Sequence, residues 1–286
     1  MILRRVVDEG LSQYSYVVAC PGAGEAAVID PRRDVDTYTG IARDENLRIA
    51  HVLETHIHAD FASGSRELAA ITGAELHLSA YDDGEVYDVA FPHRPMGDGD
   101  RLAFGDVVIE AAHTPGHTPE HLSYLVYEIS RAADTPALML SGDFLFVGSL
   151  GRPDLLGEEA KDGLARRLYA SVQTKLAGLP DGLEVHPGHG AGSMCGAGMG
   201  GRGTSTLGFE RLANPYLAPQ TEDAFLERIL ASAPPFPPYY RRMKALNAAG
   251  PPILGDLPGK QPLTPAEVGS LMTAGHVVVD LRNGLH

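Results

Sequence analysis

Short apolar runs alternate with glycine, proline and aspartate along the first 200 residues. Runs rich in β-branched and aromatic residues predict seven strands, at residues 14–19, 26–30, 49–55, 106–112, 122–128, 137–143 and 183–188. Helical patterns occupy residues 35–46, 63–72 and 158–179. This mixture predicts an α/β fold in which helices cover sheets and functional residues lie on loops at strand ends.

The pattern changes after residue 200, which predicts three parts in the chain. Residues 1–200 form the catalytic domain, and residues 201–260 form an extension with a polar helix at 221–232 and a proline-rich linker. Residues 261–286 read as a capped helix followed by a strand, the beginning of another α/β unit with too little chain left to complete it.

Composition restricts the partners and the compartment. The chain has 23 basic and 37 acidic residues, and its formal charge of -14 repels nucleic acid and anionic membranes. No apolar run reaches the length of a secretory signal or a membrane span, and two cysteines are too few for a disulfide framework. We therefore expect a cytoplasmic protein.

Side chains able to bind a metal follow three of the predicted strands. The stretch ETHIHADF follows the third strand, Asp143 follows ALMLSG, and LEVHPG leads to another histidine. A further histidine follows the Pro-Gly turn in HTPGHTPEH, where the flanking His113 and His121 are better explained as structural. Loops that leave one edge of a sheet sandwich can converge, so we expect a single metal site. Its candidate residues are His56, His58, Asp60, His117, Asp143 and His189.

This spacing resembles the metallo-β-lactamase superfamily over about residues 1 to 200, which implies an αββα sandwich. In binuclear members, such as glyoxalase II, the first motif continues HxHxDH, and the extra histidine helps to hold a second metal. Phe61 stands at that position here and cannot coordinate a metal. The resemblance therefore implies a site for one metal.

The segments THIHADFASG, TPGHTPEHLSY, SGDFLFVGSLGRPDL and HPGHGAGSMCG resemble persulfide dioxygenases of the ETHE type, in the bacterial branch fused to rhodanese modules. The resemblance implies one Fe(II) held by His56, His117 and Asp143. His58, Asp60 and His189 would then orient these ligands or bind water and oxygen beside the metal. Glutathione persulfide and O2 would react to give sulfite and glutathione.

The last segment, LTPAEVGSLMTAGHVVVDLR, resembles the start of a rhodanese domain but stops before a catalytic cysteine loop. We expect it to be either truncated or vestigial. A sulfurtransferase partner of the rhodanese type and a homo-oligomeric assembly are also expected.

Two further residues are candidates for the substrate site. Arg152, nine residues after Asp143, could bind a carboxylate of glutathione, with Arg202 a weaker candidate. Cys195 could hold persulfide sulfur during transfer, although a small buried side chain explains it equally well.

Two other functions remain open at this point. One is a mononuclear zinc hydrolase of the same fold that cleaves glutathione thioesters, and the other is a scaffold that docks sulfur carriers. A site with two histidines and one carboxylate leaves about three octahedral positions open on iron, which suits a substrate sulfur together with O2.

Overall fold

The computed structural model describes residues 1–82, 84–255 and 262–279 of the 286-residue chain. The chain divides into two compact units, Met1–Ile253 and Leu254–His286. The first unit therefore includes the helices between residues 207 and 249, which the sequence suggested as a separate extension. None of the helices in the described ranges has the length and apolar character needed to cross a membrane.

The first sheet contains six strands in the order of the sequence. They are β1 (Ile2–Asp8), β2 (Gln13–Cys20), β3 (Glu25–Ile29), β4 (Arg48–Leu53), β5 (Glu75–Ser79) and β6 (Arg94–Met96). The pairs β1–β2 and β2–β3 are antiparallel, whereas β3 to β6 run parallel. Because β3 and β4 are parallel, the loops that follow them leave the same edge of the sheet.

The second sheet has the order β14-β13-β10-β9-β8-β7. These strands are β7 (Arg101–Phe104), β8 (Val107–His113), β9 (Leu122–Glu128), β10 (Leu138–Gly142), β13 (Glu184–Pro187) and β14 (Ser205–Thr206). Neighbours are antiparallel except β10 and β13, so β8, β10 and β13 all end at one edge. A small hairpin of β11 (Leu145–Phe146) and β12 (Ser149–Leu150) follows β10.

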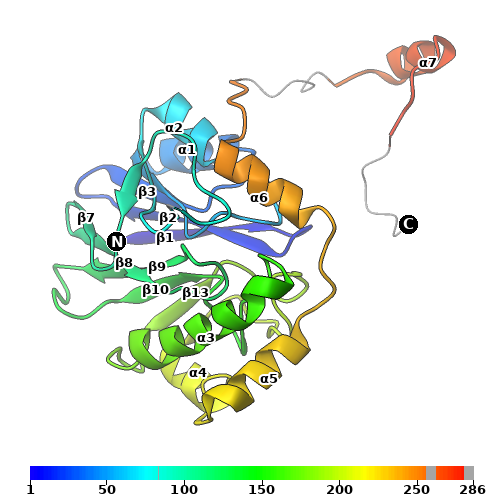
Figure 1. Cartoon of the computed structure of the whole chain (residues 1–286). Helices are drawn as coiled ribbons and strands as arrows, with labels where there is room; N and C mark the ends of the chain where they lie inside the picture. The colour runs from blue at the N-terminus through cyan, green and yellow to red at the C-terminus, as the bar shows by residue number, and fades with distance from the viewer. Residues whose placement is uncertain (83, 256–261, 280–286) are drawn as a thin grey trace. The chain divides into compact units, whose positions relative to one another are not determined.

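The two sheets pack face to face and helices cover both outer faces (Figure 1). Apolar residues of both sheets, such as Val18, Ile29, Ile109 and Val126, form the central layer. The first sheet is covered by α1 (Asp36–Asp44) and α2 (Ser65–Thr72), which pack on its outer apolar residues. The second is covered by α3 (Glu158–Lys175), α4 (Leu207–Ala213) and α5 (Glu222–Ser232). This αββα sandwich confirms the predicted fold class.

Helix α6 (Tyr240–Ala249) completes the first unit beside the loop that follows β4. In the second unit, α7 (Pro265–Thr273) begins with the capping box of Thr264 and Glu267, as the sequence predicted. Residues 276–279 form no strand, and the rest of the predicted strand lies outside the described residues. The resemblance of this segment to rhodanese stays a prediction.

Candidate metal centre

Three buried side chains from different strand ends direct free donor atoms at one point. They are His56 after β4, His117 after β8 and Asp143 after β10. His117 Nε2 lies 3.3 Å and His56 Nε2 lies 4.0 Å from Asp143 Oδ2, and the donor atoms of all three are within 4.8 Å of one another. None of these three atoms has a hydrogen-bond partner among the described residues. Unpartnered buried donor atoms are costly, so this set fits a metal ion, which binds imidazole nitrogen and carboxylate oxygen at about 2 Å.

Hydrogen bonds on the other side of each ring determine which nitrogen of each histidine faces the metal position. His117 Nδ1 lies 2.8 Å from the carbonyl oxygen of Arg152, which only accepts, so the ring donates there and its Nε2 keeps a lone pair. Thr55 Oγ1 donates to the carboxylate of Asp30 and therefore accepts from His56 Nδ1, 2.9 Å away. Both Nε2 atoms are thus unprotonated and ready to bind a metal.

Burial also favours the neutral, metal-binding form of both histidines. It lowers the pKa of both His56 and His117 well below the usual histidine value, and neighbouring histidines lower it further. Asp143 is fixed through its main chain, because its N–H donates to His121 Nε2 over 3.0 Å. Burial lowers the pKa of His121 to about 3, so this ring is a neutral acceptor.

His189 lies between two carboxylates next to the three candidate ligands. Its Nδ1 is 2.8 Å from Asp143 Oδ1 and its Nε2 is 2.8 Å from Asp60 Oδ2. Burial opposes a charge on this ring, yet the two carboxylates raise the pKa of His189 to about 10. Asp60 is thus bonded to His189. The next residue, Phe61, has an apolar ring whose centroid lies 4.4 Å from that of His58.

His58 points to a separate acidic pair. Its Nε2 lies 2.9 Å from Glu54 Oε2 and 3.2 Å from Asp30 Oδ1, and all three side chains are buried. Although burial opposes it, these carboxylates raise the pKa of His58 well above the usual value. The ring of His58 lies 4.2 Å from that of His56, but its Nε2 faces Asp30, the residue that also holds His56 through Thr55.

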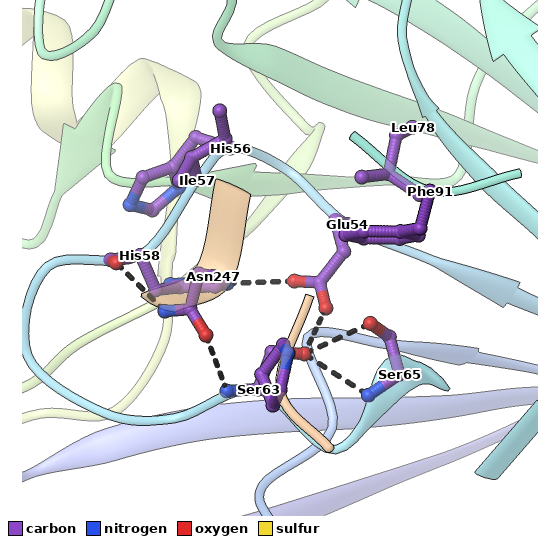
Figure 2. A pocket seen from close by; sticks show the side chains of 10 residues that line it. Glu54, His56, Ile57, His58, Ser63, Ser65, Leu78, Phe91 and Asn247 are labelled. Atoms are coloured by element: carbon purple, nitrogen blue, oxygen red, sulfur yellow. Dashed lines mark hydrogen bonds and ion pairs between the residues drawn. The ribbon is translucent and has the colours of Figure 1, made fainter. Parts of the chain in front are cut away.

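Helix α6 fixes the main chain of the ligand loop. Asn247 donates from Nδ2 to the carbonyl oxygens of His58 and Phe61, 2.8 Å away in each case, and accepts from Ser63 N. Figure 2 shows Asn247 between His58 and Ser63, with Glu54 bonded to the Ser63 hydroxyl. Lys244 is buried and donates to the carbonyl oxygen of Ile57 over 2.6 Å. A segment almost 190 residues away in sequence thus holds the loop in place.

Arg152 and Cys195 are both buried beside the centre. The guanidinium of Arg152 forms a two-bond ion pair with Asp154 and also donates to the carbonyl oxygen of Met194. Burial raises the pKa of the Cys195 thiol well above the usual value, and its Sγ lies 3.6 Å from the Tyr240 hydroxyl. These contacts give both residues a structural role, and their roles toward a substrate stay predictions.

Other residues considered from the sequence lie outside the ligand set. His113 stacks on Tyr81, and Arg202 lies over the ring of Phe209. Sequence patterns alone do not single out Lys244 or Asn247, which carry no motif. Asp30 was detectable, because it follows an apolar strand just as Asp143 does.

The sequence profile of the Metallo-beta-lactamase superfamily matches residues 8–189, more than half of the chain. The chain belongs to the metallo-beta-lactamase superfamily. Its fold and its group of potential metal ligands agree with this assignment.

Three superfamily members illustrate the range of similarity. The chain is 34% identical over 191 residues to a hydroxyacylglutathione hydrolase of Polaromonas sp., covering 66% of each chain. It is 26% identical over 228 residues to the mitochondrial persulfide dioxygenase ETHE1 of Mus musculus, covering 78% of each. The crystal structure of a metallo-beta-lactamase from Staphylococcus aureus matches with a TM-score of 0.83 and 37% identity, over 88% of this chain and 73% of that one. These members indicate a metal-dependent enzyme and include both hydrolase and dioxygenase relatives.

Proposed function

We propose that this protein is a mononuclear non-haem Fe(II) persulfide dioxygenase that acts on glutathione persulfide, or a related small persulfide, in persulfide detoxification. The observation that supports this most is the donor set of two imidazole nitrogens and one carboxylate oxygen that have no hydrogen-bond partner among the described residues. Two histidines and one carboxylate form the set typical of non-haem iron oxygenases. Similarity to the mouse persulfide dioxygenase adds support.

When bound, the iron would supply adjacent open positions at which the persulfide sulfur and O2 meet. The protein contributes the orientation of its ligands. Thr55 and the carbonyl oxygen of Arg152 fix the rings of His56 and His117, and His189 holds one oxygen of Asp143 so that the other stays free. The reaction balances as persulfide, O2 and one water giving thiol, sulfite and two protons.

The remaining residues have supporting parts in this proposal. His189 is bonded to Asp143 and to Asp60, and Asp60 Oδ1, which has no hydrogen-bond partner among the described residues, could accept from water beside the metal. Arg152 and Cys195 stay candidates for contact with the substrate, and a rhodanese partner and a homo-oligomer stay predictions. A cytoplasmic location is supported by two cysteines that are both free.

A zinc-dependent hydrolase of glutathione thioesters is the second candidate. The identity of 34% to a hydroxyacylglutathione hydrolase favours it. Zinc with three protein ligands also leaves a position for an activated water. The two candidates need the same ligands but differ in the metal and in the need for O2.

The test is O2 uptake with sulfite detection. The full chain, purified without oxygen and loaded with Fe(II) or with Zn(II), receives glutathione persulfide or an S-acyl glutathione. We expect equimolar O2 loss and sulfite with Fe(II) alone. His117→Ala should abolish both, whereas His113→Ala, which removes the histidine at the end of β8 that stacks on Tyr81 outside the ligand set, should retain them. Thioester cleavage by the zinc form without persulfide oxidation by the iron form would refute the proposal in favour of the hydrolase.

A further inference from the structure

A second group of possible metal ligands lies on the first sheet, away from the strand ends that carry the centre described above. His51 is on β4, and Glu75 and His77 are on the neighbouring strand β5. In the parallel register His51 pairs with Glu75, and Leu53 pairs with His77. The ring of His51 lies 5.8 Å from that of Phe104 on the second sheet and 5.3 Å from that of His77.

We propose that His51, Glu75 and His77 form a second metal site, which takes zinc or a similar divalent ion of the first transition row. His51 Nδ1 and His77 Nε2 are 3.2 Å apart, and Glu75 Oε2 is 3.9 Å and 3.8 Å from them. These three distances place one point about 2.1 Å from all three atoms, the length of zinc bonds to nitrogen and oxygen. An ion slightly displaced from the plane of these three atoms toward solvent would have tetrahedral geometry, with water as the fourth ligand.

The surroundings prepare this group for a cation. Arg94 binds Glu75 Oε1 at 3.0 Å, so the other carboxylate oxygen is the one that faces the histidines. The side chains of His51 and His77 are 14% and 6% exposed, whereas that of Glu75 is 46% exposed, so an ion can enter from one side. Burial lowers the pKa of both histidines, that of His77 to about 4, so both rings are neutral at pH 7.

Nearby positive charges lower the affinity of this group for a cation but do not block it. Arg94 adds a positive charge, and Arg48, which also faces His51, is paired with Glu25. The two histidines share one hydrogen between them without a metal, so binding requires one ring to move its proton to the other nitrogen. Because three ligands come from two hydrogen-bonded strands, the metal would also link β4 to β5.

The site has a consequence for metal analysis of this protein. A chain with two independent sites can carry zinc on the sheet and iron at the strand ends, so the zinc content of a preparation does not identify the catalytic metal. The inference is independent of the proposed function, because it uses none of its residues.

Cobalt(II) titration of the chelator-treated full chain tests the site, with visible absorbance and bound metal per chain as readouts. We expect two Co(II) for the wild type, one for His77→Ala and two for His93→Ala, which removes a nearby histidine outside the group. His117→Ala should also bind one, and this ion should be lost when His77→Ala is added. Glu75→Gln, at an exposed position, should weaken the second site at least tenfold and serves as the test if His77→Ala fails to fold.

Zinc binding should also raise the unfolding temperature of His117→Ala but not of His117→Ala/His77→Ala, since a ligand of the folded state stabilises it. One Co(II) per wild-type chain, or undiminished binding of the second ion in His77→Ala and Glu75→Gln, would overturn the proposal.

Discussion

Asn247→Ala should show how much α6 contributes to the stability of the chain and to metal affinity, without changing a candidate metal ligand. Asn247 is buried and forms three hydrogen bonds with the main chain of residues 58–63. Its removal leaves two carbonyl oxygens and one N–H without partners. At about 1 kcal/mol for each bond, we expect the free energy of unfolding to fall by about 3 kcal/mol. The affinity of the His56 centre for Co(II) should fall about 10- to 100-fold, because the ligand loop loses its support.

The assay is urea unfolding of the metal-free chain together with Co(II) titration of the folded chain. Arg242→Ala, on the exposed side of the same helix, is the matched control and should change neither quantity appreciably. Asn247→Asp keeps the acceptor for Ser63 N but places a carboxylate oxygen against two carbonyls, so it should be at least as destabilising as alanine. A loss below about 1 kcal/mol with unchanged Co(II) affinity would refute the idea that α6 fixes the loop.

Three other changes test particular parts of the structure. Gly142→Ala should lower the free energy of unfolding in urea by at least about 2 kcal/mol, because the φ of Gly142 is 52° and a Cβ there would lie 2.7 Å from His121 Nε2. The control Gly163→Ala, on the exposed face of α3, should be neutral or stabilising. Equal effects of the two substitutions would contradict this reasoning. Burial lowers the pKa of His77 to about 4, so between about pH 6.5 and pH 4 the unfolded chain binds a proton that the folded chain lacks. The free energy of unfolding therefore decreases as the pH is lowered through that window. In the metal-free chain His77→Gln should reduce this acid destabilisation by up to about 3 kcal/mol, and an identical pH dependence would count against the burial effect. Both cysteines are buried, so a thiol reagent at pH 7 should label the native chain far more slowly than the unfolded chain, and rapid labelling of Cys195 would instead indicate a reactive thiolate.

Strong local patterns made much of the fold predictable. All seven predicted strands exist within one or two residues, and the helices near 35–46, 63–72, 158–179 and 221–232 are confirmed. Strand β1 was missed because Arg4 and Arg5 interrupt its apolar residues, which is acceptable on an edge strand with exposed side chains. Strands β5, β6 and β7 are short and depend on their neighbours for hydrogen bonds, and α6 follows a proline-rich stretch that reads as a linker.

The candidate metal ligands were easier to find in the sequence than the residues that support them. A histidine or aspartate just beyond an apolar strand is visible in the sequence, and this signal applies equally to His56, Asp143 and His189. Which of these bind the metal depends on hydrogen bonds between loops, such as the one that joins His189 to Asp60 across 129 residues. No local pattern encodes such a contact, and the same is true of the bonds from Asn247.

The hydrogen bonds of His189 bear on our proposal that this centre holds one metal. Ionised carboxylates only accept hydrogen bonds, so a histidine bonded to a carboxylate oxygen at each ring nitrogen carries two protons. His189 is such a ring, placed between Asp60 and Asp143, so in the metal-free chain it is a cation bonded to both carboxylates. A second divalent ion at Asp60, His189 and Cys195, whose possible ligand atoms lie within 4.8 Å of one another, would have to displace at least one of these protons, and Phe61 offers no further donor atom. With one metal, the open coordination positions lie on a single ion, which suits a reaction that joins two small reactants there better than one that shares a hydroxide between two metals.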